Sequence, residues 1–185
     1  MIILASNSPR RKEILTKHNI NFKIVVSNVD EKIETNKTPY EIAESLAYQK
    51  ANYVFENNSD DIVLGFDTIV VLNNKIYPKP KDELEEKTFL NELSGKIHEV
   101  ITGVSIISAK KTLSFHVVSK VEFKTLTEED INYYISTNEW VDKAGGYAIQ
   151  GKGMILVERI HGDYFNVVGM PMHHLVEELK AFINI

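Results

Sequence analysis

Short apolar runs alternate along this chain with amphipathic segments of helical period, a pattern that predicts strands and helices in alternation. The runs typical of strands cover residues 1–4, 22–26, 62–72, 100–107, 113–123 and 154–160. The helical segments begin near Ser8, Thr38, Asp82, Thr127 and Pro171, and turns between neighbouring strands fall at Asn73-Asn74 and 109–111. Because βα units and hairpins are combined, we expect an α/β fold, a mixed β-sheet with flanking helices.

Residues 5–11, Ala-Ser-Asn-Ser-Pro-Arg-Arg, follow the first strand and open a helix. Ser8 is suited to the N-cap and Pro9 to the first helical position, where its missing N–H costs nothing. The unpaired amides of such a first turn attract phosphate, and Arg10 and Arg11 add bidentate donors beside them. The pattern therefore predicts an anion site, although an ordinary capped helix with two solvated arginines fits the same residues.

Asp67 is the sole ionisable group in the apolar run 62–72. A carboxylate buried there without a partner would cost several kcal/mol, so it requires a cation, a metal or a set of hydrogen-bond donors. Gly65, two residues earlier, would leave room for a ligand to approach the backbone. The alternative is an aspartate that caps a turn at the end of a strand.

Lys50 lies on the predicted apolar face of the helix that starts at Thr38. The other members of this face are Ala43, Leu46, Ala47, Ala51 and Val54. The lysine either extends along the edge of the core or points its ammonium at an anion in a cleft. Lys79 is a second candidate because Pro78 and Pro80 restrict its backbone, and its alternative is a stiff, solvated loop.

The stretch 146–153, Gly-Tyr-Ala-Ile-Gln-Gly-Lys-Gly, matches a phosphate-binding P-loop up to its last residue, which must be Ser or Thr and is Gly153 here. Residues 138–143 before it do not have a strand pattern either, so we reject a P-loop ATPase or GTPase. We expect a flexible loop whose backbone amides, with the Gln150 amide, suit the edge of a nucleobase. The local sequence assigns no role to His98.

The composition of the 185 residues, 43% hydrophobic and 25% charged, fits one globular domain over residues 1–185. No run approaches the roughly 18 apolar residues of a membrane span and no signal peptide pattern is present, so we expect a cytoplasmic protein without a membrane partner. The absence of cysteine excludes disulfides and thiol catalysis. The formal charge of -5 argues against nucleic-acid binding but allows a local cationic pocket.

Six motifs, in order along nearly the whole chain, resemble those of the Maf family. They are residues 5–11, Leu46-Ala47 with Lys50-Ala51, Gly65-Phe66-Asp67-Thr68-Ile69-Val70, Lys79-Pro80-Lys81-Asp82, Leu93-Ser94-Gly95 with His98, and residues 142–151. Each motif is weakly specific, whereas six at suitable separations are a strong signal. The resemblance implies two lobes around a substrate cleft and a relationship in fold to the inosine triphosphate pyrophosphatases.

The resemblance also implies a nucleoside triphosphate pyrophosphatase, and the loop 142–151 is similar to that of the branch that hydrolyses dTTP and UTP. By the family pattern Asp67 is the proton acceptor. The positions associated with substrate specificity are Arg10, Thr68 and Gln150, and other polar positions of the cleft are matched by Glu31, Lys50 and Lys79. Pro78 stands where the family usually has glycine, which would stiffen the loop and shift Lys79 slightly.

The mechanism that follows from the resemblance is metal-assisted hydrolysis between the α- and β-phosphates, giving a nucleoside monophosphate and pyrophosphate. Glu31 and Asp67 would hold Mg²⁺ or Mn²⁺, which prefer hard oxygen ligands, and Asp67 would orient or deprotonate a water. Thr68 and Gln150 would contact the pyrimidine. The triphosphate would be bound at the helix start at Ser8 and neutralised by Arg10, Arg11, Lys50 and Lys79.

Two other interpretations stay open at this point. A pyrophosphatase for purine or damaged nucleotides would share nearly every feature except the loop around Gln150. A non-catalytic regulator of cell division would need a partner surface, and the sequence has no exposed apolar stripe that nominates one. The sequence also leaves open the metal, the choice between a normal and a modified pyrimidine nucleotide, and the oligomeric state, of which a homodimer is one option.

Overall fold

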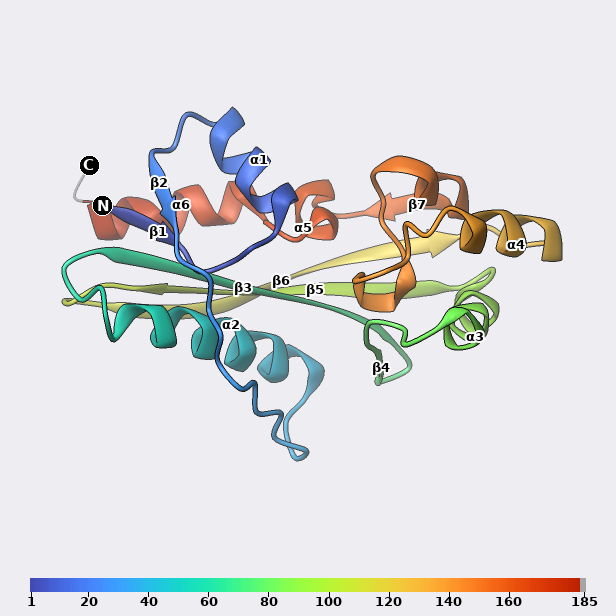
Figure 1. The fold of residues 1–185 in the computed structure, drawn as a ribbon, viewed down its shortest axis with the longest axis horizontal. Helices are drawn as coiled ribbons and strands as arrows, with labels where there is room; N and C mark the ends of the chain where they lie inside the picture. The colour runs from blue at the N-terminus through green and yellow to red at the C-terminus, as the bar shows by residue number, and fades with distance from the viewer. Residues whose placement is uncertain (184–185) are drawn as a thin grey trace. The chain divides into compact units, whose positions relative to one another are not determined.

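The computed structural model describes residues 1–183, so Asn184 and Ile185 of the predicted domain lie outside the described residues. The elements in chain order (Figure 1) are β1 (Ile2–Leu4), α1 (Pro9–Lys17), β2 (Phe22–Ile24), α2 (Pro39–Phe55), β3 (Ile62–Leu72), β4 (Lys75–Tyr77), α3 (Glu83–Leu93), β5 (Ile97–Ile107), β6 (Thr112–Phe123), α4 (Glu128–Ser136), the short 3-10 helices η1 (Ala144–Gly146) and η2 (Gly151–Leu156), β7 (Val157–His161), α5 (Tyr164–Val168) and α6 (Met172–Ile183). None of the described helices is both long enough and apolar enough to span a bilayer.

The residues form two compact units. The first holds Met1–Asp67, Thr102–Val117 and the chain from Gly169, and the second holds Thr68–Ile101 and Val118–Val168. Strands β3, β5 and β6 contribute residues to both units, and the hydrogen-bonded strand order is β2-β1-β3-β5-β6-β7, with β4 paired to β3. The predicted mixed sheet with flanking helices is confirmed.

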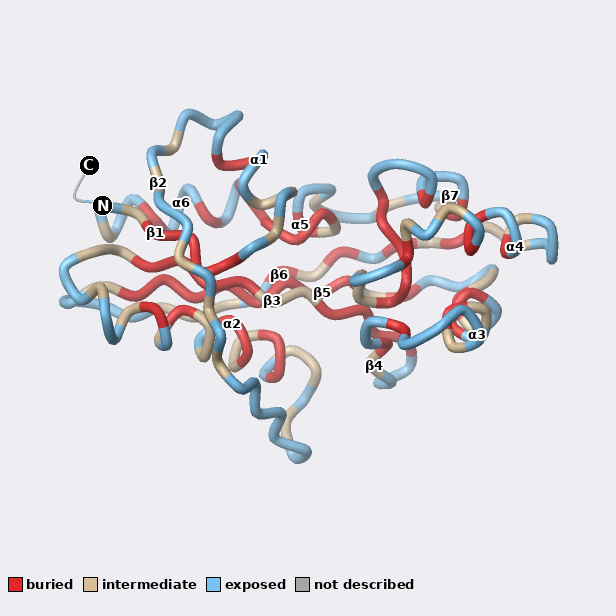
Figure 2. The backbone as a smooth tube through the Cα atoms, viewed as in Figure 1, coloured by how far each residue is buried: buried red, intermediate tan, exposed pale blue. Residues whose placement is uncertain are grey.

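In the first unit, the short strand β1 lies between two parallel neighbours, because Ile2 pairs with Phe22 of β2 and with Ile62 of β3. Helix α2 covers one side of these strands, and α1 and α6 cover the other (Figure 1). The residues of β1 and β3 are mostly buried, whereas those of the edge strand β2 are half-buried or exposed (Figure 2). A core cluster of Ile3, Ala5, Ala51, Val54, Val63 and Ile107 joins α2 to the strands.

In the second unit, β4 returns antiparallel to β3 through the predicted hairpin at Asn73 and Asn74. Both asparagines have left-handed backbone, with φ of 51° and 62°, as a two-residue hairpin turn requires. Strand β7 pairs antiparallel with the end of β6. Helices α3 and α4 pack on a core that includes Phe89, Leu90, Leu93, Phe123, Ile131, Tyr134, Trp140 and Tyr147.

The predicted helix starts are confirmed, because Ser8, Thr38, Asp82 and Thr127 each accept a backbone N–H of the first turn. The predicted strand at 154–160 is wrong in its first half, where η2 occupies Gly151–Leu156 and β7 starts only at Val157. Gly153 packs so closely on Ala148 that a β-carbon would stand 2.1 Å from the Ala148 carbonyl oxygen, so the chain turns tightly there. Strand β2 is shorter than expected, and α5 was not predicted.

Candidate functional site

Helix α2 lies very close to two strands of the first unit because both strands carry glycine at the contact. A β-carbon on Gly65 of β3 would stand 2.2 Å from the Ala47 carbonyl oxygen, and one on Gly103 of β5 would stand 2.1 Å from that of Ala43. The expectation that Gly65 leaves room for a ligand is therefore wrong, because the helix backbone fills that space. The close approach instead brings the next turn of α2 beside β3.

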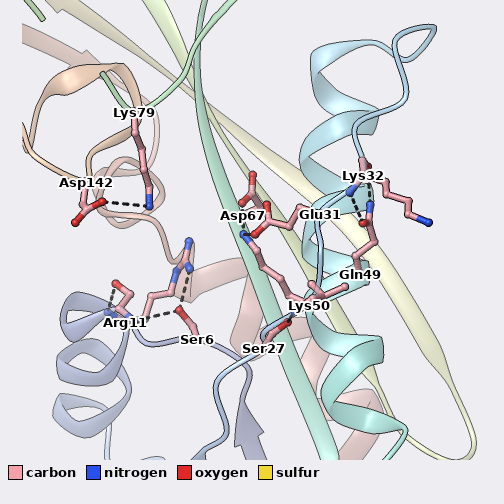
Figure 3. Close-up of polar contacts among 12 residues, drawn as sticks. Ser6, Arg11, Ser27, Glu31, Lys32, Gln49, Lys50, Asp67, Lys79 and Asp142 are labelled. Atoms are coloured by element: carbon pink, nitrogen blue, oxygen red, sulfur yellow. Dashed lines mark hydrogen bonds and ion pairs between the residues drawn. The ribbon is translucent and has the colours of Figure 1, made fainter. Parts of the chain in front are cut away.

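Lys50 of this turn points its ammonium at two carboxylates (Figure 3). Its Nζ is 2.5 Å from Oδ1 of Asp67 and 3.2 Å from Oε1 of Glu31. The Lys50 and Asp67 side chains are only 19% and 13% exposed, whereas Glu31 is 42% exposed. Asp67 lies inside β3 and has a cation, as its burial requires, and is not a turn cap at a strand end.

Glu31 comes from the irregular segment between β2 and α2, and a side chain of the helix fixes this segment. The Gln49 side chain accepts the Lys32 N–H at 2.9 Å and donates to the Lys32 carbonyl oxygen at 2.9 Å (Figure 3). Because Gln49 and Lys50 are neighbours on α2, the same turn that carries the ammonium also positions Glu31. Sequence reasoning missed Gln49, since only the fold brings residue 32 beside residue 49.

Several contacts hold the side chain of Arg11 in the first turn of α1. Arg11 donates from Nε to the Gly169 carbonyl oxygen at 2.9 Å and from Nη1 to Oγ of Ser6 at 3.1 Å, and its guanidinium lies 5.4 Å from the Phe66 ring centroid. Burial lowers the pKa of Arg11 to about 10, and the nearby Asp67 carboxylate opposes this shift. Arg11 is thus charged and held in place, and Arg10, the preceding residue, is half-buried as Arg11 is.

Ser8 caps this helix as predicted, accepting the Arg11 N–H at 3.5 Å. Its own N–H donates to Oγ of Ser6 at 3.2 Å, and Ser6 also accepts from the Arg11 guanidinium. Ser6 therefore ties the loop after β1 to the helix start, a role that the local sequence did not indicate.

The remaining predicted site residues belong to the second unit. Thr68 follows Asp67 along β3 and is half-buried. Lys79 is exposed, with its Nζ 3.8 Å from Oδ1 of Asp142 (Figure 3). The preceding residue, Pro78, accepts the Gly145 N–H at 3.1 Å, so the Lys79 segment and the glycine-rich loop are joined through their backbones.

The glycine-rich loop is more firmly held than the sequence predicted. The Ala148 N–H donates to the Tyr134 hydroxyl at 3.2 Å, and the Lys152 N–H donates to Oε2 of Glu139 at 2.6 Å. Residues 147–149 are buried, and Gln150 is exposed. A short 3-10 helix that begins at Gly151 and then a strand follow Gln150, without the α-helix that a P-loop places there, which agrees with the rejection of that class.

Two buried ionisable side chains lie close to this loop. His98 contacts the Tyr147 hydroxyl through Nε2 at 2.8 Å, and burial lowers the pKa of His98 to about 4, so the ring is neutral at pH 7. Glu86 of α3 packs against Gly146. Sequence reasoning missed Glu86, although its helical spacing to the core residue Phe89 would have placed it on the buried face.

The carboxylates of Glu31 and Asp67 fit a divalent cation of the hard type. Both already contact one positive charge, that of Lys50, and both offer oxygen ligands. Among residues 1–183 no cluster of three or more acidic, histidine or cysteine side chains has metal-binding geometry. A Mg²⁺-like ion held by one or two carboxylates takes its other ligands from water and substrate phosphates, which suits a site with two protein oxygens.

The arrangement of strands and helices is that of the Ham1 proteins. A HAM1 protein from Coxiella burnetii superposes with a TM-score of 0.56 and 15% identity, covering 97% of this chain and 98% of that one. The Staphylococcus aureus Ham1 protein gives a TM-score of 0.52 and 15% identity, with coverages of 99% and 97%. These likenesses define the fold class.

Comparison of the amino-acid sequence with known proteins identifies the family. The family model for Maf-like proteins matches residues 1–182, and this chain belongs to the Maf family. It is 56% identical to a dTTP/UTP pyrophosphatase of Bacillus cereus (strain G9842) over 98% of this chain and 95% of the relative. A dTTP/UTP pyrophosphatase of Bacillus thuringiensis subsp. konkukian (strain 97-27) is 54% identical with the same coverages.

Proposed function

We propose that this chain hydrolyses dTTP and UTP to the nucleoside monophosphate and pyrophosphate. The observation that carries the proposal is the Lys50 ammonium bound between Asp67 and Glu31 in a chain 56% identical to a dTTP/UTP pyrophosphatase. A sheltered carboxylate within reach of a bound substrate is suited to orient a single water, and an acidic pair is a suitable metal site.

In the proposed mechanism, Asp67 orients a water at the α-phosphate and takes up its proton. Glu31 and Asp67 would hold Mg²⁺ or Mn²⁺, which when bound would acidify water and offset phosphate charge. The Asp67 carboxylate is well placed to act on one water because β3 and α2 enclose its side chain and leave only 13% of it exposed.

Binding of the phosphates and recognition of the nucleobase are assigned to separate residues. Arg10, Lys50 and Lys79, with the α1 start at Ser8, bind the triphosphate and its growing negative charge. Arg11 adds its charge from a fixed position, since two of its donors are already bound to Ser6 and Gly169. Thr68 and Gln150 contact the pyrimidine. The cytoplasmic location and the oligomeric state stay predictions.

The test is an assay of pyrophosphate release from a panel of pyrimidine, purine and modified nucleoside triphosphates with Mg²⁺ or Mn²⁺. Wild-type protein should favour dTTP and UTP, and Asp67→Asn should lower kcat by about 100- to 10,000-fold, the usual range for a lost general base. Asp61→Asn is the matched control, because Asp61 directly precedes β3 and pairs with the amino terminus at the surface. Release of single phosphates, a preference for purines, or near wild-type turnover by Asp67→Asn would contradict the proposal.

A further inference from the structure

A glutamate lies on the buried face of α3, among side chains that pack into the core. Phe89, Leu90 and Leu93 occupy this face, and Glu86 completes the set at helical spacing. Glu86 is 0% exposed, and within residues 1–183 neither of its carboxyl oxygens has a hydrogen-bond partner. Burial raises the pKa of Glu86 to about 9, so the carboxyl group is neutral at pH 7.

The Glu86 carboxyl group occupies the space where a side chain at position 146 would lie. A β-carbon built on Gly146 would stand 1.7 Å from Oε2 and 2.6 Å from Cδ of Glu86. A buried polar group without a partner is costly, and an apolar side chain of similar size would fill a core position without that cost. The contact with the loop therefore calls for an explanation beyond core packing.

The turn at Gly145 and Gly146 is held from three sides. Both glycines have left-handed backbone, with φ of 68° and 74°. A β-carbon on Gly145 would stand 2.7 Å from a methyl group of Val70, and the Gly145 N–H donates to the Pro78 carbonyl oxygen at 3.1 Å. Glu86 closes the third side, so its removal frees the turn to move toward α3.

This turn determines where Gln150 leaves the core. The three residues between Gly146 and Gln150 are buried, the Tyr147 hydroxyl is bonded to His98, and the Ala148 N–H is bonded to a tyrosine hydroxyl. Because only three buried residues separate Gly146 from Gln150, a displacement of the turn large enough to break these contacts also moves the point at which Gln150 leaves the core.

We propose that Glu86 is a positioning residue for substrate binding, whose carboxyl group fills the space beside Gly146 and holds the turn that sets the position of Gln150. The inference rests on the proposed function in one respect, the contact of Gln150 with the pyrimidine. Glu86 acts through Gln150, which contacts the nucleobase. The loss of the Glu86 carboxyl group therefore weakens substrate binding and leaves the hydrolytic step nearly intact.

Steady-state kinetics of pyrophosphate release from dTTP and UTP test this role. Glu86→Ala should raise KM about tenfold while kcat stays within about twofold, the pattern of lost uniform binding. Glu86→Gln, which has the shape of the neutral carboxyl group, should keep KM within about threefold of wild type. Glu83→Ala is the matched control, since Glu83 is an exposed glutamate of the same helix, and it should leave both constants unchanged.

A second substitution tests the contact from the loop side. Gly146→Ala brings a methyl group into the place of Oε2 and should raise KM at least as much as Glu86→Ala. Combining the two removes the clash of that methyl group with the Glu86 carboxyl group and leaves the backbone strain of alanine at a φ of 74°, so the double variant should have a lower KM than Gly146→Ala alone but not the wild-type value. Such non-additivity is expected of residues in direct contact.

Three results would overturn the inference: an unchanged KM in Glu86→Ala, an equal loss in Glu86→Gln, or additive effects in the double variant. A wild-type protein that releases no pyrophosphate from dTTP or UTP would instead refute the proposed function. In that case the coupling between positions 86 and 146 is still measurable from the thermal denaturation midpoints of the four proteins, so the two failures are distinguishable.

Discussion

Replacing Lys50 with methionine removes the ammonium that contacts both acidic side chains of the candidate metal site. Methionine keeps an unbranched apolar stem, so the packing of the α2 face is largely preserved. The change leaves Asp67, whose side chain is 13% exposed, without its cation, and leaves the half-exposed Glu31 able to turn toward water.

The size of the effect follows from the geometry. At an effective dielectric constant of about 20, the 2.5 Å contact with Asp67 corresponds to a gross attraction of about 7 kcal/mol, most of which offsets desolvation. Truncating one partner of a buried pair costs about 3–5 kcal/mol.

We therefore expect Lys50→Met to lower the free energy of unfolding by about 2–4 kcal/mol at pH 7 in urea titrations with EDTA present. The matched control is Lys75→Met. Lys75 pairs with Glu92 at the same 2.5 Å but on the surface, where a pair contributes less than about 1 kcal/mol.

The same variant tests the competition between lysine and metal. In the wild-type protein a divalent cation must displace the Lys50 ammonium from Asp67, so Lys50→Met should bind Mn²⁺ about 10- to 100-fold more tightly in calorimetric titrations without nucleotide, at about 1.4 kcal/mol per factor of ten. Mn²⁺ affinity that is unchanged or weaker in the variant would refute the shared site. Equal destabilisation by Lys75→Met would refute the role of burial.

Three further outcomes follow from contacts elsewhere in the chain. Gly65→Ala, which places a β-carbon 2.2 Å from the Ala47 carbonyl oxygen, should lower the free energy of unfolding by about 3 kcal/mol in urea, and a loss below 1 kcal/mol would contradict the close packing. Because burial lowers the pKa of His98 from 6.5 to about 4, the unfolded chain binds a proton in this range that the folded chain does not. The free energy of unfolding should fall by about 3 kcal/mol as the pH drops from 6.5 to 4. A His98→Gln variant measured in urea should lack that part of the pH dependence. Arg11→Lys loses the bond to the Gly169 carbonyl oxygen and should cost about 1–2 kcal/mol, seen as a lower thermal midpoint than for Lys12→Arg, a change at an exposed position on the same helix.

The prediction of the helix starts and of the longest strands needed only local rules. The capping side chains at Ser8, Thr38, Asp82 and Thr127 act within one helical turn, so their role is visible in a few residues. The first half of the predicted strand 154–160 was misassigned because its apolar residues suit a strand as well as the 3-10 turn that the glycines impose.

Periodicity indicated that Lys50 and Asp67 were unusual but not that they were partners. Each broke an apolar pattern, on a helix face and in a strand, and burial of a lone charge requires compensation. The identity of the partner depended on α2 approaching Gly65, a contact between residues far apart in the sequence. For the same reason Gln49, which anchors the segment of Glu31, gave no local signal.

The sequence by itself determined the order of elements, the family and the residues whose charges do not suit their apolar surroundings. These properties depend on short-range geometry, on pattern and on motif spacing, all of which are present before the chain folds. Only the tertiary structure decided which charges meet. Lys50 bridges Asp67 and Glu31, Arg11 binds Gly169, and Glu86 lies against Gly146 because packing brings distant backbones within a few ångströms, and no local preference encodes such distances.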